Sequence, residues 1–249
     1  MNRIRQEQMK KYIENNSVAT IKELRALFPD VSLMTIHRDL DVLESEGVIV
    51  KYRGGVKSVH HPDDVEFNIR MHENNAGKQI MAEKAISLIK PYSSVFLDAG
   101  TSNLVLAKNM PDMSINVVTT GPGTAIELCR LHKPIITLCC GTMNRRNLAI
   151  SGQNTLEILE RINIDTAFIG VSGYSAETGF SCGTEADMLI KRMVIKKART
   201  SVVLCGAEKF KRVMPYTFAS ISEVDYIITD EPMPKSFVQE VKKAGVILL

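Results

Sequence analysis

The segment VSLMTIHRDLDVLESEGVIVKYRGGV, residues 31–56, decides the fold of the first part of the chain. Ser32 is well placed to cap a helix, because its hydroxyl can accept from a backbone N–H of the first turn. Ile36, Leu40 and Leu43 then recur at the spacing of one helix face. The segment therefore predicts an amphipathic helix that packs on other helices.

Two more helices are predicted before this one. Residues 3–15 carry an apolar stripe with helical spacing, which indicates a supporting helix. Thr20 and Glu23 match the capping box that begins a second helix. Pro29 ends that helix, because proline has no N–H to donate. Residues 20–43 therefore predict a helix, a turn and a helix.

A basic hairpin is predicted after the third helix. Residues 47–61 alternate as in a strand, turn at a Gly-Gly pair and return. Acidic side chains are absent from this segment, and its basic side chains are Lys51, Arg53 and Lys57. The helices and the hairpin together predict a winged helix.

Each of these signals has a plain structural explanation, because helix pairs usually serve packing and Gly-Gly pairs usually make turns. Their conjunction indicates DNA binding. A helix in the major groove can offer Arg38 to guanine, while basic residues of the wing meet phosphates. The predicted DNA-contacting residues are Ser32, Met34, Thr35, His37, Arg38, Lys51, Arg53, Gly54, Gly55 and Lys57.

The composition is that of a globular protein with an ample core. The chain has 249 residues, of which 45% are hydrophobic and 24% charged. Its formal net charge is only +3, so that any surface for nucleic acid must be local. The five cysteines show no CxxC spacing, and no apolar run is long enough to cross a bilayer. We expect a cytoplasmic protein without metal, cofactor or membrane contact.

The pattern changes after the hairpin. Residues 61–77 are polar and acidic and predict a linker or a connecting helix. From residue 78 short aliphatic strands alternate with helices, the first of them near 78–89, which is typical of an α/β domain with a mostly parallel sheet. The predicted strands are SVFLD, INVVTT, PIITLCC, DTAFIGV, SVVLC, DYIIT and GVILL. The predicted organisation is a winged helix-turn-helix domain in residues 1–60, a linker in 61–77 and an α/β domain in 78–249.

Small and polar residues follow the predicted strands, in the segments LDAGTSN, TTGPGT, CCGTMNRR, GVSGYS and LCGAEKF. Ligands of open α/β sheets bind at this edge, and a helix N-terminus can hold an anion such as phosphate. A single such loop is more often a plain turn, and Lys209 is as easily a surface charge. Residues 185–198 predict an amphipathic helix whose charges form a solvated face.

The segment VSLMTIHRDLDVLESEGVIVKYRGG resembles the N-terminal signature of the DeoR family of bacterial transcriptional regulators, with His37 where the family usually has arginine. FLDAGTS, VVTTG, AFIGVSGYSAETGF and EKF resemble motifs of the family's effector domains. The resemblance implies a domain like ribose-5-phosphate isomerases and CoA-transferases that binds phosphorylated sugars. The implied pocket is Asp98, Gly100, Thr101, Ser102, Thr119, Gly121, Gly141, Ser151, Gly152, Gly170, Gly173 and Lys209.

Two functions from different classes remain open at this point. The first is a regulator, most simply a repressor of a sugar-metabolism operon, that binds operator DNA as a homo-oligomer and responds to a sugar phosphate. The second is a sugar-phosphate isomerase or CoA-transferase-like enzyme with an attached nucleic-acid-binding domain. Isomerisation needs a carboxylate base, for which Asp98 and Glu185 are the candidates. We favour the regulator, which has no catalytic residues.

Overall fold

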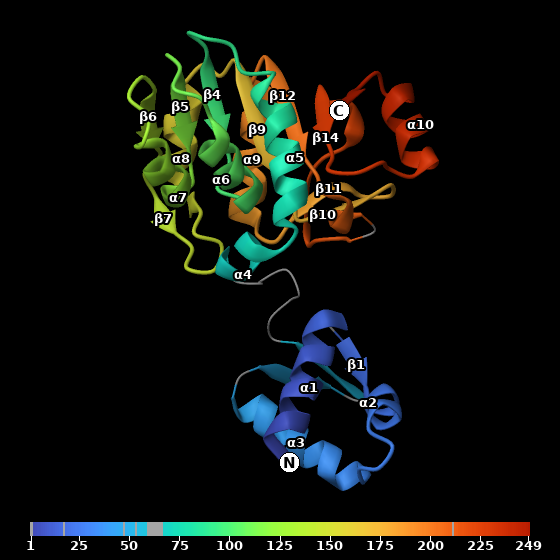
Figure 1. Cartoon of the computed structure of the whole chain (residues 1–249). Helices are drawn as coiled ribbons and strands as arrows, with labels where there is room; N and C mark the ends of the chain where they lie inside the picture. Colours follow the sequence, from blue (N-terminus) through green and yellow to red (C-terminus); the bar gives the residue numbers. More distant parts are fainter. Residues whose placement is uncertain (1, 17, 47, 53, 59–66, 211) are drawn as a thin grey trace. The chain divides into compact units, whose positions relative to one another are not determined.

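The computed structural model describes residues 2–16, 18–46, 48–52, 54–58, 67–210 and 212–249. The chain divides into two compact units, residues 1–65 and 66–249, which are drawn in Figure 1. Part of the segment predicted as a linker is helical and belongs to the second unit, since two helices, α4 and α5, begin at Phe67 and Asn75.

The first unit contains the predicted helix, turn, helix and hairpin. A three-stranded antiparallel sheet of order β1-β3-β2 completes it, because the short strand β1 pairs with the hairpin. Its elements are α1 (Asn2–Asn16), β1 (Val18–Thr20), α2 (Ile21–Leu27), α3 (Leu33–Ser45), β2 (Ile49–Tyr52) and β3 (Gly55–Ser58).

The core of this unit is the one that the apolar spacing predicts. Ile36, Leu40 and Leu43 of α3 are almost fully buried, and so are Met9 and Ile13 of α1. The capping box of Thr20 and Glu23 is formed in both directions, which starts α2 directly after β1. The winged-helix prediction is therefore confirmed for the described residues.

The second unit is built on a seven-stranded parallel sheet of order β15-β14-β12-β9-β4-β5-β6. The strands are β4 (Ser94–Leu97), β5 (Asn116–Thr119), β6 (Ile135–Leu138), β9 (Thr166–Gly170), β12 (Thr200–Leu204), β14 (Tyr226–Ile228) and β15 (Ile247–Leu248). Every one of them falls on a predicted strand, so the prediction of a mostly parallel α/β domain is confirmed.

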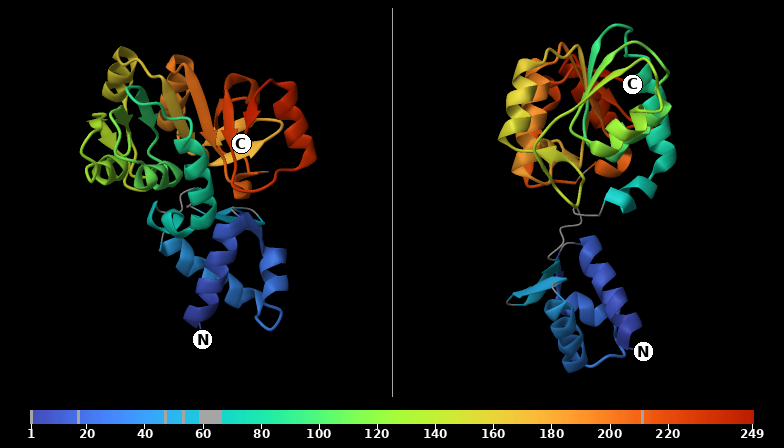
Figure 2. Two further views of the ribbon diagram at one scale, coloured as in Figure 1. Left: turned by 45° about the horizontal axis from the view of Figure 1, so that its top comes forward. Right: turned by 90° about the vertical axis from the view of Figure 1, so that its left-hand side faces the viewer.

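Helices cover both faces of this sheet (Figure 2). Those packed on one face are α5 (Asn75–Ile86), α6 (Thr101–Asn109) and α7 (Pro122–Leu128), and α4 (Phe67–His72) precedes them. The helices whose residues pack on the other face are α8 (Gln153–Arg161), α9 (Glu185–Lys197) and α10 (Lys235–Lys243). Two separate apolar cores result, and strand residues alternate between them.

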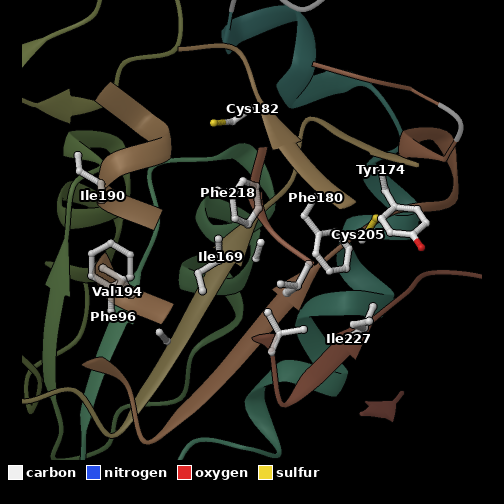
Figure 3. Close-up of a cluster of buried hydrophobic side chains, with 14 of the residues drawn as sticks. Phe96, Ile169, Tyr174, Phe180, Cys182, Ile190, Val194, Cys205, Phe218 and Ile227 are labelled. Atoms are coloured by element: carbon white, nitrogen blue, oxygen red, sulfur yellow. The ribbon is translucent and has the colours of Figure 1, made fainter. Parts of the chain in front are cut away.

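A small antiparallel sheet of order β10-β11-β13 closes one end of the larger core and was not predicted. Figure 3 shows its Phe180 and Phe218 near Ile169 of the main sheet, and its Tyr174 on the other side of Phe180, beside Cys205. The remaining elements are β7 (Thr142–Met143), β8 (Ile150–Ser151), β10 (Gly173–Ser175), β11 (Gly179–Cys182), η2 (Ala207–Lys209), β13 (Tyr216–Ala219) and η3 (Ile221–Glu223).

Candidate functional site

The exposed face of α3 is the first candidate site. Ser32 caps the helix, because its Oγ accepts from the Thr35 N–H at 3.2 Å, and the two hydroxyls lie 2.9 Å apart. His37 and Arg38 are exposed, and Met34 is 72% exposed. The exposed side of the helix is therefore polar with some apolar side chains, of which Met34 is the most exposed, while its other face fills the core.

Asp39, the neighbour of Arg38, points inward and was not singled out in the sequence. It is 2% exposed, and its carboxylate accepts from Arg5 Nε at 2.6 Å and from Gln6 Nε2 at 2.9 Å. The hydrogen bond to Asp39 raises the pKa of Arg5. This contact holds α1 against α3. A signal was present, because Asp39 lies three residues after Ile36 and four before Leu43, on the buried face.

The wing is tied to the helix through Lys51. Its backbone N–H donates to Glu44 Oε1 at 2.9 Å, and its Nζ pairs with Asp41 and, at 3.5 Å, with Glu44 Oε2. Its hydrogen bond to Asp41 raises the pKa of Lys51. The wing sequence itself has no acidic residue, but α3 supplies two. Lys51 therefore carries a compensated charge.

The other predicted wing residues are described to different extents. Gly54 is exposed with φ +101°, a conformation that favours glycine, and its carbonyl accepts from the Ile21 N–H at 3.2 Å. Gly55 is buried and begins β3. The backbone of Lys57 lies in β3, whereas its side chain and all of Arg53 lie outside the described residues.

The second candidate site lies at the carboxyl edge of the parallel sheet. The predicted polar segments follow β4, β5, β6, β9 and β12, which are parallel neighbours, so that they reach one edge as expected. Asp98 organises its centre. Its Oδ1 accepts from the Ala99 N–H at 2.9 Å, and its Oδ2 accepts from the Gly170 N–H at 3.0 Å and from Lys191.

Lys191 corrects the prediction that the charges of residues 185–198 form a solvated face. It is 4% exposed, pairs with Asp98 and donates to the Gly170 carbonyl at 3.0 Å, and it lies 3.6 Å from Asp187 Oδ1. Burial lowers the pKa of Lys191, but the two carboxylates raise it above its ordinary value. Burial also raises the pKa of Asp187. The ion pair locks α9 onto the sheet edge.

The N-terminal turn of α6 lies next to this ion pair. Its N-cap is Gly100, which supplies no side chain, and it continues with the buried Thr101 and the half-buried Ser102. Asn103 is 0% exposed, and its Oδ1 and Nδ2 have no hydrogen-bond partner among the described residues. A Cβ at Gly170 would lie 3.7 Å from Asn103 Nδ2 and 3.2 Å from Asp98 Oδ2. Helix N–H groups and an unpaired amide are thus concentrated at one point.

The other predicted pocket residues fall into smaller groups. Thr119 is buried, and its hydroxyl accepts from the Gly121 N–H at 3.0 Å, which holds the loop after β5. Gly141 packs against the Ser151 carbonyl, where a Cβ would come within 2.5 Å. The remaining three do not contact Asp98 in any described interaction: Gly152 is the exposed N-cap of α8, Gly173 abuts the Arg212 carbonyl, and Lys209 pairs with Glu208 at 3.4 Å.

Two independent matches bear on identity. A DeoR-like helix-turn-helix domain matches residues 5–61, and a DeoR C-terminal sensor domain matches residues 73–231. The chain belongs to the DeoR family of transcriptional regulators. The transcriptional regulator GlpR of Haloferax volcanii is 31% identical over 88% of this chain and 86% of its own length. YgbI of Escherichia coli K12, an uncharacterised transcriptional regulator, is 32% identical over 95% of this chain and 93% of its own.

Among solved structures, ribose 5-phosphate isomerase A of Methanocaldococcus jannaschii overlaps 55% of this chain and 55% of its own, with 16% identity and a TM-score of 0.41. Membership of the DeoR family makes the chain a DNA-binding regulator with a sensor domain, and the enzyme alternative has no support. Asp98 is a poor candidate base, because its carboxylate already accepts from two backbone N–H groups and Lys191.

No group of three or more His, Cys, Asp or Glu side chains in the described part of the chain could hold a metal ion. Likewise, no helix among those residues is long and apolar enough to cross a membrane.

Proposed function

We propose that this DeoR-family regulator represses a sugar-metabolism operon, that it acts in the cytoplasm as a homo-oligomer, and that a phosphorylated sugar controls it. The five cysteines are all free, which suits a reducing compartment. One winged helix reads only a short half-site, so two copies related by a twofold axis would be needed for a useful operator specificity.

The DNA half of the proposal rests on the exposed face of α3. Arg38 is exposed and can donate to the O6 and N7 acceptors of a guanine in the major groove. Met34 and His37 lie beside it and can contact base edges or thymine methyl groups. In this proposal Lys57, Arg53 and the Gly54 turn approach the phosphates, which positions the helix without reading sequence.

The effector half rests on one observation, the N-terminal turn of α6 at the sheet edge. Gly100 leaves the helix N–H groups without a side-chain cap among the described residues, and the Thr101 and Ser102 hydroxyls lie in the same turn. Such a terminus favours a phosphate through its N–H groups and its dipole. The unpaired amide of Asn103 points to a further polar ligand group in the same place. Asp98 would hold the loop rather than bind the sugar.

The test uses the full chain. Genomic DNA fragments that bind it are selected first, and their release is then followed by fluorescence anisotropy with a panel of phosphorylated sugars and their unphosphorylated forms. We expect one phosphorylated sugar to change operator affinity at a concentration where its unphosphorylated form does not. Equal responses to both forms would remove the phosphate from the proposal, and the absence of any selected fragment would remove the operator.

A further inference from the structure

The corner between α4 and α5 is built into the carboxyl edge of the sheet. Asn74 occupies it with φ +44°, and its Oδ1 accepts from the Gly77 N–H at 3.2 Å to cap α5. Its Nδ2 donates to Glu208 Oε2 at 2.9 Å and to Asp230 Oδ2 at 2.7 Å. Glu208 follows β12 and Asp230 follows β14, so the corner lies where the predicted ligand loops lie.

Lys78 connects this corner to α4. The side chain is only 5% exposed, and its Nζ donates to the Arg70 carbonyl and, at 2.5 Å, to the Glu73 carbonyl. Arg70 lies in the last turn of α4, which ends at His72, and Glu73 follows the helix, so that Lys78 donates to carbonyls at the C-terminal end, where intrahelical donors are lacking. The buried ammonium of Lys78 therefore caps the C-terminal end of a helix of six residues. A helix of this length is too short to be stable alone.

Lys78 lies within the electrostatic field of two other cations, Lys209 on η2 and Arg70 on α4, and of the Glu208 and Glu73 carboxylates. Burial lowers the pKa of Lys78, and the positive charge of Lys209 on η2 lowers it further. Burial also lowers the pKa of Arg70 on α4, whose guanidinium lies within the field of the Asp187 and Asp98 carboxylates. Partly buried cations that oppose one another favour a bound anion, which relieves their repulsion and desolvation together.

We propose that the anionic group of the effector binds to Lys78 and Lys209 as well as to the N-terminal turn of α6, and that Lys78 then releases the end of α4. The inference rests on the proposed function and names its regulation. A phosphate oxygen is a stronger acceptor than a backbone carbonyl, so it competes successfully for the ammonium. Both α4 and α5 pack against α6, and Asn74 ties the corner to Glu208 and Asp230 at the same carboxyl edge of the sheet at which α6 begins.

The consequence concerns the link to the winged helix. In sequence, α4 is the first described helix after the first unit. Its other described attachments include the buried ring of Phe67, the bond from the Phe67 N–H to the Arg146 carbonyl at 2.9 Å and its packing against α6. Loss of the Lys78 bonds removes the hydrogen bonds from Lys78 that hold the C-terminal end of this short helix. Binding at the sensor site thereby changes how firmly α4 is held, and α4 is the helix that follows the DNA-binding unit in the sequence.

The experiment measures amide hydrogen exchange of residues 67–72 in the full chain, with inorganic phosphate or with sodium chloride at equal ionic strength. Phosphate is used at a concentration that raises the Tm of the chain, because binding stabilises the folded state. We expect phosphate to increase exchange in α4 several-fold, and to leave exchange in α10 unchanged. A rise in Tm without any change in α4 would overturn the inference while leaving the phosphate site intact.

Two variants sharpen this result. In Lys78→Met exchange in α4 should be fast already and should no longer respond to phosphate. Lys84→Met is the matched control, because Lys84 lies on the same helix and its Nζ donates to the Thr229 carbonyl at 2.7 Å, away from α4. A phosphate response in Lys78→Met equal to that of the unchanged chain would contradict the role of Lys78. If phosphate raises the Tm at no concentration, the proposed function itself loses its anion site.

Discussion

Lys191 of α9 and Asp98 at the end of β4 form an ion pair in which both side chains are almost fully buried. The same ammonium donates to the Gly170 carbonyl, and the same carboxylate accepts from the Gly170 N–H. Three segments far apart in the sequence are thereby fixed at one point of the sheet edge. The backbone around the α6 N-terminus is thus held in place before any ligand arrives.

Replacing Lys191 with Met should lower the free energy of unfolding of the second unit by about 3 kcal/mol, because removal of one partner leaves a buried charge uncompensated. Chemical denaturation followed by circular dichroism measures the loss. The control is Arg192→Met, an exposed neighbour on the same helix that should change stability little. The double variant Lys191→Met, Asp98→Asn should recover part of the loss. Equal stability of Lys191→Met and Arg192→Met would show that the ion pair contributes nothing to the free energy of unfolding.

The sequence predicted the elements whose pattern is local. Ile36, Leu40 and Leu43 identified the buried face of α3, and the aliphatic runs identified all seven strands of the parallel sheet. The family motif identified the loop after β4, where Gly100 and Ser102 lie. Each of these features depends on spacing within one segment, which a single sequence displays.

The residues that a single sequence could not place are those with distant partners. Asn74 bonds to Glu208 and Asp230, which lie 134 and 156 residues further along the chain. Lys78 lay at the start of a predicted helix with nothing to mark it as buried. Lys191 had a weak signal, since it lies next to the buried Ile190 and three residues before Val194. Spacing places a residue on a face but does not identify its partner.

At the DNA surface, Arg38→Ala should weaken binding to the selected operator by about 1–3 kcal/mol and weaken binding to unrelated DNA much less. The reason is that a bidentate contact to guanine is sequence-specific, whereas a phosphate contact is not. Competition anisotropy with both DNAs measures the two losses. Arg161→Ala removes the same charge from the other unit and should change neither affinity. Equal losses on the two DNAs in Arg38→Ala would assign Arg38 to a phosphate.

The two lysines of the wing should differ in salt dependence. Lys51 is already paired with Asp41 and Glu44, so Lys51→Ala should change the slope of log K against log salt by less than one. Lys57→Ala should reduce that slope by about one if its ammonium meets a phosphate. Titrations over a range of salt concentrations measure both slopes. A full reduction in Lys51→Ala would mean that DNA displaces the two carboxylates of α3.

Asn103→Leu should leave the unliganded chain as stable as before or about 1 kcal/mol more stable, since a buried amide without partners is costly. The same change should weaken stabilisation by phosphorylated sugars, because the polar group facing the ligand is lost. Thermal unfolding with and without the sugar measures both effects. Destabilisation by more than about 1 kcal/mol without ligand would show that the amide is satisfied in solution, for example by a buried water.

Ser102→Asp should fold and bind operator DNA but respond at least about tenfold more weakly to the sugar phosphate, a loss of about 1.4 kcal/mol. The new carboxylate lies in the first turn of α6, where it suits the helix dipole but repels an incoming phosphate in a partly desolvated site. Ser236→Asp is the matched control, because Ser236 is the second residue of α10, as Ser102 is the second residue of α6. Ser236 is exposed and lies outside the proposed site. Operator release by the sugar phosphate measures the response. An unchanged response in Ser102→Asp would place the phosphate elsewhere, and Ser102→Ala, which adds no charge, should lose less.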